Sequence, residues 1–256
     1  MKLGFAGSGS MAAAMARGWA TAERRPEAMQ FADSGSGRAA KLAAEVGGTA
    51  VASLAELAAA SDVIVLAVKP VALDQAAAEL ASPPLPVISV LGATSLGRLR
   101  EAFPARPVIR TMPTIAAEIH QAVICHVPLG EPEREVGAEL LALLGSLGTL
   151  VELEDERMDA ATAIMGCTPA YVALIVESLT AAVASEGFDH DLSQQLVIDT
   201  FASTAALLRN SSPQAVRNAV ASPGGSTEAG LDALEAAGVP EGFADAVKAS
   251  LDRMRG

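Results

Sequence analysis

A glycine-rich turn near the start of the chain carries the residue pattern that most directly suggests chemistry. Gly7 and Gly9 follow a short apolar run, residues 3–6, and Ala12 stands where a third small residue falls. This G-x-G-x-x-A spacing, between an expected strand and an alanine-rich helix, is typical of a dinucleotide site. The second glycine lets the backbone approach a pyrophosphate, and the free N–H groups of the helix face its charge. We therefore predict a nucleotide site here; the alternative is an ordinary strand-to-helix turn.

Asp33 follows the second expected strand, residues 29–32, and bears on the choice of nucleotide. A carboxylate at this place accepts hydrogen bonds from ribose hydroxyls and repels a 2′-phosphate, which favours NADH. Ser34, Ser36 and Arg38 come next and would suit a phosphate. The residues therefore leave NADH and NADPH open, with a slight preference for NADH, and an ordinary turn at Asp33 remains the alternative.

The segment Ala67-Val68-Lys69-Pro70 completes a continuous apolar run, residues 63–68, that predicts a central parallel strand buried on both faces. Ligands of open α/β sheets bind at the carboxyl ends of such strands. We therefore predict that Lys69 hydrogen-bonds a ribose or a phosphate of the dinucleotide. The alternative is a solvated lysine in front of a proline turn.

A second glycine-rich turn, residues 222–227 with the sequence SPGGST, opens an expected helix late in the chain. Its N–H groups and the hydroxyls of Ser226 and Thr227 would converge on a small volume at the positive end of that helix. This combination predicts an anion site suited to a carboxylate. The alternative is a plain turn in which one of the two hydroxyls caps the helix.

Strands and helices alternate over the first part of the chain, and only helices are expected after it. We expect strands at 3–6, 29–32, 63–68, 87–90, 108–110, 122–127 and 150–153, and helices at 38–46, 71–80, 96–102 and 133–147. Further helices are expected at 157–186, 191–209, 212–220, 226–237 and 241–255. This order predicts a doubly wound, mostly parallel α/β domain over residues 1–153 and an all-helical domain over residues 154–256.

The composition argues against several classes of partner. The formal net charge is −12 and no basic run exceeds two residues, so we expect no nucleic-acid partner. The three histidines and two cysteines have no metal-ligand spacing, and two distant cysteines suit a reducing cytoplasm. An uncharged run, residues 160–176, is short for a membrane span and holds Gly166 and Pro169, so we expect a buried helix pair or a kinked helix there. No signal peptide is expected, because the first strand follows Lys2.

Four motifs, residues 7–11, 67–70, 166–171 and 222–227, stand in an order and at separations similar to those of pyrroline-5-carboxylate reductases. The chain resembles that family from end to end. The resemblance implies a Rossmann domain followed by a helical dimerisation domain that interlocks with a second protomer, in a homodimer or a higher oligomer. It also implies a cytoplasmic oxidoreductase of proline biosynthesis, which reduces the cyclic imine 1-pyrroline-5-carboxylate to L-proline with NAD(P)H.

The resemblance also implies roles for individual residues. The pyrophosphate would be held by Gly7, Ser8, Gly9, Ser10 and Met11, and the ribose and nicotinamide would lie beside Ala67, Val68, Lys69 and Pro70. Asp33 and Ser34 complete the expected cofactor site. The substrate carboxylate would be bound by Ser222, Gly224, Gly225, Ser226 and Thr227. Thr227 would lie near the ring nitrogen as hydrogen-bond partner or proton donor, and Asp155 stands where relatives carry a glutamate near the substrate.

Three departures from the family pattern bear on activity. Thr114 replaces an asparagine, Leu54 replaces an asparagine that touches the cofactor in relatives, and Cys167-Thr168 replaces a smaller pair. They motivate two alternatives: a paralogue that reduces another cyclic imine carboxylate, such as a piperideine carboxylate, and a dinucleotide-binding protein without catalysis. The sequence leaves these alternatives, the cofactor preference and the oligomer size open.

Overall fold

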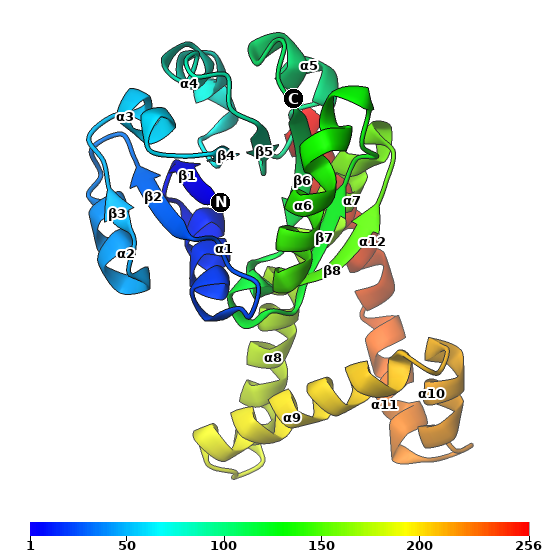
Figure 1. Ribbon diagram of the computed structural model, residues 1–256. Coiled ribbons are helices and arrows are strands. Elements are labelled where there is room, and N and C mark those ends of the chain that lie inside the picture. The colour runs from blue at the N-terminus through cyan, green and yellow to red at the C-terminus, as the bar shows by residue number, and fades with distance from the viewer. Residues whose placement is uncertain (256) are drawn as a thin grey trace. The chain divides into compact units, whose positions relative to one another are not determined.

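The computed structural model describes residues 1–255, which form two compact units (Figure 1). The first unit contains residues 1–166 together with the last residues from Arg253 onward, and the second contains residues 167–252. Residues 154–166, which follow the predicted domain boundary, belong to the first unit, and Met158 is buried there. The division of function between residues 1–153 and 154–256 stays a prediction.

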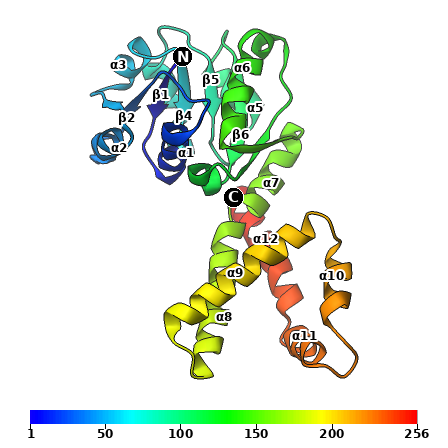
Figure 2. The same cartoon turned by 60° about the horizontal axis from the view of Figure 1, so that its bottom comes forward.

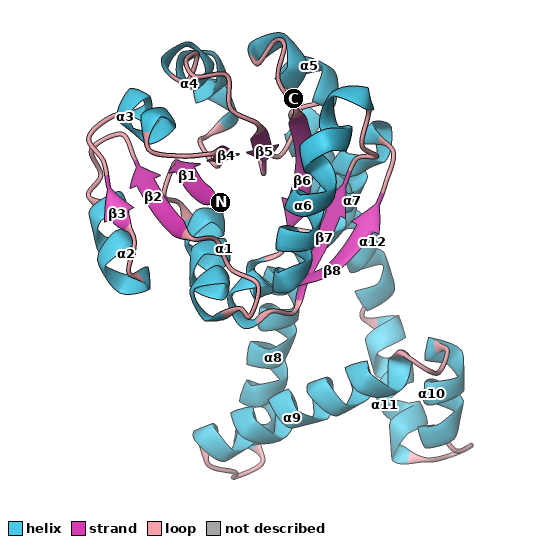
Figure 3. Ribbon diagram, in the orientation of Figure 1, coloured by secondary structure: helices cyan, strands magenta, loops and turns pink. Residues whose placement is uncertain are grey.

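The first unit is built on one sheet of eight strands, in the order β3-β2-β1-β4-β5-β6-β7-β8 (Figure 3). The strands are β1 (Lys2–Ala6), β2 (Ala28–Ala32), β3 (Thr49–Ala50), β4 (Val63–Leu66), β5 (Val87–Ser89), β6 (Val108–Pro113), β7 (Ala122–His126) and β8 (Gly148–Glu152). Neighbouring strands are parallel except β6 and β7, which pair antiparallel. The predicted doubly wound, mostly parallel sheet is confirmed. Its strand order reverses between β1 and β4, where such sheets bind ligands.

Helices cover both faces of this sheet. One face packs against α1 (Ser10–Thr21), α2 (Arg38–Val46) and α6 (Arg134–Leu144) (Figure 2), and the other against α3 (Leu54–Ala59), α4 (Leu73–Glu79) and α5 (Leu96–Ala102). In β4, Val63 and Val65 belong to the first core, and Ile64 and Leu66 to the second. Successive side chains of a strand point to opposite faces, so a strand covered on both faces must be apolar throughout.

The sequence analysis missed two short elements, β3 and α3. Two side-chain hydrogen bonds cap the start of α3: Ser53 Oγ accepts from the N–H of Glu56 at 3.1 Å, and Glu56 Oε2 accepts from the N–H of Ala52, just before the N-cap, at 3.0 Å. The S-x-x-E spacing was the signal that marks this helix start. Every predicted strand differs from the observed one by one to three residues at an end; β4, for example, ends at Leu66, and β6 continues to Pro113.

The second unit is all helical, as predicted. It consists of α8 (Thr168–Ser185), α9 (His190–Leu208), α10 (Pro213–Val220), α11 (Ser226–Ala236) and most of α12 (Val239–Arg255). The segment 157–186 forms two helices, α7 (Met158–Met165) and α8, because Pro169 in the first turn of α8 has no N–H to continue the hydrogen-bond ladder. The expectation that this pair is buried is wrong for α8, since within the described chain only its Thr180 is buried.

Candidate active site

The turn after β1 brings the start of α1 to the carboxyl end of β4. Gly7 has a φ of +101°, and a Cβ at this position would lie 2.5 Å from the carbonyl oxygen of Ala67, so only glycine fits. A Cβ at Gly9 would meet no described atom within 4 Å. No side chain of the described residues caps α1, which leaves its first N–H groups available to a ligand.

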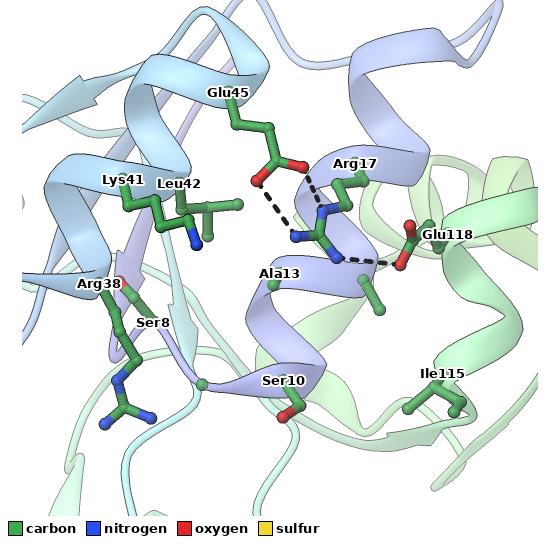
Figure 4. A pocket seen from close by; sticks show the side chains of 12 residues that line it. Ser8, Ser10, Ala13, Arg17, Arg38, Lys41, Leu42, Glu45, Ile115 and Glu118 are labelled. Carbon is green, nitrogen blue, oxygen red and sulfur yellow. Dashed lines mark hydrogen bonds and ion pairs between the residues drawn. The ribbon is translucent and has the colours of Figure 1, made fainter.

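A pocket of about 350 Å³ opens beside this turn, between α1 and α2 (Figure 4). It is lined by Ser8, Gly9, Ser10, Ala13, Ala14, Arg17, Arg38, Lys41, Leu42, Glu45, Ile115 and Glu118. The Ser8 hydroxyl is buried and has no hydrogen-bond partner among the described residues. A buried hydroxyl without a partner costs free energy, so a bound group that accepts its hydrogen bond would be stabilised here.

Three basic and two acidic side chains line this pocket, and both acidic ones pair with the same arginine. Arg17 of α1 lies between Glu45 and Glu118, at 2.6 Å and 3.2 Å (Figure 4). The hydrogen bonds to these two carboxylates raise the pKa of Arg17, which is thus held as a cation. Arg38 and Lys41 add two positive charges from α2. They are three residues apart on a helix and therefore share a face.

Asp33 directs its carboxylate into its own loop. Oδ1 accepts from the N–H groups of Gly35 (2.8 Å) and Ser36 (3.0 Å), and Oδ2 accepts from Ser36 Oγ (2.9 Å) and Ala39 N (2.7 Å). Burial opposes ionisation, but these hydrogen bonds outweigh it and hold the pKa of Asp33 below its ordinary value. All four acceptor directions of this carboxylate are used within the chain. Its role toward a ribose stays a prediction.

Two residues predicted to bind the cofactor, and one loop that sequence analysis missed, lie at the carboxyl edge of the sheet. Because β1, β4 and β5 run parallel, the edge that carries Gly7 also carries exposed Lys69 and the loop of residues 90–95. In this loop Ala93 adopts a left-handed φ of +52°, and Thr94 is buried. The end of an apolar run followed by a glycine, at Gly92, was the signal available in the sequence.

Two departures from the family pattern have structural accounts. Thr114 extends the pairing of β6 with β7: its N–H donates to Val123 O at 3.0 Å, and its Oγ1 accepts from Val123 N at 3.2 Å. Leu54 begins α3 and packs against the core under α3, α4 and α5. Both side chains are thus engaged within the first unit. Cys167 precedes α8, and nothing in the structure explains the Cys167-Thr168 pair.

The turn of residues 222–227 forms the start of α11, as its sequence predicts. Gly224 has a φ of +73°, and a Cβ at Gly225 would lie 2.7 Å from Ser222 Oγ. Within residues 1–255 no side chain caps α11 at Gly225, which leaves the N–H groups of Ser226 and Thr227 available to a ligand. Sequence analysis missed Glu228, whose Oε2 accepts from Gly224 N at 2.7 Å. A glutamate in the first turn of an expected helix was its signal.

Asp155 lies in the first unit, in the short helix η5 (Asp155–Arg157), and is engaged by other protein groups. Its carboxylate accepts from Arg110 Nη1 at 2.7 Å, and both of its oxygens lie close to Leu96 N, at 3.1 Å and 3.0 Å. The contact of Asp155 with a substrate stays a prediction.

The histidines have local partners. His120 Nε2 lies 2.8 Å from Gly18 O, and His126 Nδ1 lies 3.1 Å from Val127 O. In the part of the chain that the structure describes, no group of three or more His, Cys, Asp or Glu could hold a metal ion.

Family models match both ends of the chain. Residues 155–256 match the family described as pyrroline-5-carboxylate reductase dimerisation, and residues 2–92 match the family described as NADP oxidoreductase, coenzyme F420-dependent. A pyrroline-5-carboxylate reductase of Thermus thermophilus is 34% identical over 257 residues, which cover 99% of this chain and 97% of the relative. One of Synechocystis is 36% identical over 203 residues, which cover 77% and 76%.

Solved structures agree with these matches. The Plasmodium falciparum pyrroline carboxylate reductase with NADP bound superposes with a TM-score of 0.87 at 28% identity, covering 99% of this chain and 97% of that one. The 1-pyrroline-5-carboxylate reductase of Streptococcus pyogenes gives the same TM-score of 0.87 and covers 99% and 98%. The similarity therefore extends over both units of the chain.

Proposed function

The chain belongs to the pyrroline-5-carboxylate reductase family, and we propose that one of its units binds the cofactor and the other binds the substrate. The activity of this family is the NAD(P)H-dependent reduction of 1-pyrroline-5-carboxylate to L-proline. The first unit would bind the cofactor at Ser8, Gly9 and Ser10. The second would bind the carboxylate of the cyclic imine at residues 222–227. The observation that carries the proposal is a helix start with free N–H groups, next to a buried and unpartnered Ser8 hydroxyl.

The cofactor site fits a dinucleotide on its own chemistry. The free N–H groups of α1 and the Ser8 hydroxyl are donors, and a pyrophosphate is an acceptor on every side. Gly9 leaves room for it to approach the backbone. When bound, the nicotinamide supplies the hydride. Lys69, Val68 and Pro70, at the end of β4, would lie beside the ribose and nicotinamide.

We infer from the pocket wall a preference for NADPH over NADH. The group that would repel a 2′-phosphate, the Asp33 carboxylate, is turned into its own loop by four hydrogen bonds. Arg38 and Lys41 line the pocket beside the glycine turn and can make charge-assisted hydrogen bonds to a phosphate. This proposal differs from the slight preference for NADH that the residue types alone suggested.

The proposed role of the turn at residues 222–227 is to orient the substrate carboxylate rather than to activate the imine. The imine nitrogen is basic enough to arrive protonated, so the protein does not have to supply a strong acid. Free N–H groups at the start of α11 would hold the substrate carboxylate, and the half-buried Thr227 would hydrogen-bond the ring nitrogen. Fixing the ring in this way lowers the barrier by positioning.

Thr227→Ala tests this assignment. We expect a fall in kcat of about tenfold or more, with the affinity for NADPH within about twofold of the wild type. Ser226→Ala is the comparison variant: Ser226 also carries a hydroxyl at the start of α11, but it is exposed and proposed to bind the substrate carboxylate, so its loss should raise KM for the imine with kcat unchanged. Unchanged turnover in Thr227→Ala would remove this side chain from the mechanism.

Initial rates of NADPH and NADH oxidation with 1-pyrroline-5-carboxylate test the reaction itself. We expect turnover with the five-membered ring, and a lower kcat/KM with a piperideine carboxylate. A higher kcat/KM with the six-membered ring would identify a paralogue with a different substrate. Cofactor binding without any imine-dependent oxidation would establish the non-catalytic alternative.

The second unit carries an apolar surface that suits a second copy of the chain. A groove of about 580 Å³ lies between α8 and α12, lined mainly by apolar side chains such as Leu174, Leu179 and Phe243, which are 61%, 44% and 45% exposed. Apolar patches of this kind mark interfaces. Residues 155–256 match a dimerisation family, and homo-oligomerisation follows from that match. We propose that a helix of the second copy fills the groove.

The same reasoning bears on the membrane. By length and composition alone, the segment Asp155–Ser185 could span a bilayer, and little of it is buried. Because this segment falls inside the dimerisation match, we propose that a second subunit covers it. We also propose a cytoplasmic location, with neither a membrane nor a nucleic acid as partner. Analytical ultracentrifugation without detergent tests whether a second subunit covers this segment: a dimer or higher oligomer is expected, and a monomer that requires detergent would contradict the proposal.

A further inference from the structure

Arg110 is a buried cation that joins three segments of the first unit. Its side chain, 3% exposed, extends from β6 to two carboxylates: Nη1 donates to Asp155 Oδ1 and Nη2 to Asp159 Oδ1, both at 2.7 Å. Nη1 also donates to the backbone carbonyl of Asp155 at 3.2 Å. The planar guanidinium therefore fixes both the side chain and the backbone of Asp155.

Asp155 in turn binds the start of α5. Its two carboxylate oxygens lie 3.1 Å and 3.0 Å from Leu96 N. Leu96 is the first residue of α5, and its N–H has no acceptor within the helix. Ser95, the N-cap, accepts from Arg98 N at 3.2 Å instead. A residue from η5 thus completes the capping of α5.

The loop of residues 90–95 ends at this hydrogen bond. It leaves β5 at the carboxyl edge of the sheet, next to the end of β4 where Lys69 lies. Ala93 holds a left-handed φ of +52°, and the Thr94 hydroxyl donates to Gly92 O at 3.1 Å. A residue with a Cβ keeps such a backbone conformation only when surrounding contacts hold it.

We propose that Asp155, oriented by Arg110, is a positioning residue that holds the loop 90–95 in the conformation that borders the nicotinamide. The proposal rests on the proposed function, because this loop matters for catalysis only if a nicotinamide lies at this edge. It differs from the substrate contact that the family resemblance implies for Asp155. The acceptor directions of the carboxylate that the structure shows in use point to Arg110 and Leu96.

Glu133 provides a matched control at the other end of β6. Its carboxylate accepts from Arg100 Nη2 at 3.1 Å and from Val108 N at 3.3 Å, and its side chain is 2% exposed. It therefore has the same kinds of partner as Asp155, an arginine and a backbone N–H. Val108 is the first residue of β6, so this pair lies at the amino edge of the sheet, away from the loop 90–95.

The experiment compares Asp155→Ala, Asp155→Asn and Arg110→Lys with Glu133→Gln in the full-length protein. For Asp155→Ala we expect kcat with 1-pyrroline-5-carboxylate and NADPH to fall about tenfold or more, with KM for the imine within about twofold. The primary deuterium isotope effect on hydride transfer should rise, because that step becomes slower. Asp155→Asn keeps an acceptor for Leu96 N–H and should recover part of kcat, whereas Glu133→Gln should change neither kcat nor the isotope effect.

Hydrogen exchange supplies a readout that does not depend on activity. Amides of the loop 90–95 and of Leu96 should exchange faster in Asp155→Ala than in the wild type, and at the wild-type rate in Glu133→Gln. Unchanged exchange in this loop would overturn the proposal. So would a rise of about tenfold in KM for the imine with kcat unchanged, because that pattern indicates direct contact between Asp155 and the substrate.

Two further outcomes are decisive. If Glu133→Gln lowers kcat as much as Asp155→Ala does, the effect is general stability and the proposal is wrong. If Asp155→Ala does not fold, Asp155→Asn and Arg110→Lys decide by the same readouts. A wild-type protein without imine-dependent turnover would contradict the proposed function, and the exchange measurement would then still decide whether Asp155 holds the loop.

Discussion

The carboxylate of Glu228 accepts a hydrogen bond from the amide of Gly224 at 2.7 Å, so the turn proposed to bind a carboxylate already carries one. Glu228 stands in the first turn of α11, where a negative charge is favoured by the helix dipole. The same charge lies near the proposed site of the substrate carboxylate and would repel it. The Glu228 side chain therefore stabilises the turn at residues 222–227 and would weaken the binding of a carboxylate there.

Glu228→Gln separates these two effects. Glutamine keeps a carbonyl oxygen that can accept from Gly224 N–H, but it carries no charge. We expect KM for 1-pyrroline-5-carboxylate to fall about two- to fivefold with kcat unchanged, because a repulsion of up to about 1 kcal/mol is removed. Steady-state kinetics measure this. Glu228→Ala, which loses the hydrogen bond as well, should raise KM, and a raised KM in Glu228→Gln would show that the charge itself supports binding.

Gly7→Ala should lower the stability of the fold, whereas Gly9→Ala should lower the affinity for the cofactor. At position 7 a Cβ would lie 2.5 Å from Ala67 O with φ at +101°, so we expect a loss of roughly 2 kcal/mol or more in the free energy of unfolding. At position 9 the space is open in the free protein, so stability should be unchanged. Cofactor affinity should nevertheless fall, because a Cβ there would obstruct the pyrophosphate. Chemical denaturation and cofactor titration distinguish the two, and equal stability losses would contradict this account.

Lys41→Ala should weaken NADPH selectively. Lys41 and Arg38 lie on the pocket face of α2, and a charge-assisted hydrogen bond to a phosphate contributes about 1.5–3 kcal/mol. We expect KM for NADPH to rise about tenfold in Lys41→Ala or Arg38→Ala, with KM for NADH within about twofold. NADH serves as the internal control, since it lacks the 2′-phosphate. Parallel changes for both cofactors would place these side chains elsewhere on the dinucleotide.

Asp33→Asn should change how stability depends on acid pH. The pKa of Asp33 is lowered in the folded chain, because hydrogen bonds from its loop outweigh the opposing effect of burial. A lowered folded-state pKa contributes stability above the unfolded-state pKa, and that contribution is lost as pH falls through the folded-state value. The difference in unfolding free energy between wild type and Asp33→Asn should therefore be largest near neutral pH and shrink from about pH 5 downward. A pH-independent difference would contradict this reading.

The sequence by itself determined the elements that depend on local pattern. The helices predicted at 38–46 and 96–102 have those bounds as α2 and α5, and the apolar run predicted as a strand at 63–68 contains one, at 63–66, that is buried on both faces. Side-chain periodicity and turn residues act over a few positions, so they can be recognised without knowledge of the fold. β3 escaped this reasoning because two residues are too short for any period to show.

Only the tertiary structure decided which carboxylates remain available to ligands. Asp33 is taken by backbone amides of its own loop, and Asp155 by Arg110 and by Leu96, which is 59 positions away in the sequence. The pairing of Arg17 with Glu45 and Glu118 likewise joins three separate segments around one pocket. A carboxylate has the same chemistry in every sequence context, but its free acceptor directions depend on the N–H groups that folding brings to it. That is why residue types could suggest a dinucleotide cofactor, whereas the proposed preference for NADPH rests on the folded arrangement of Asp33, Arg38 and Lys41.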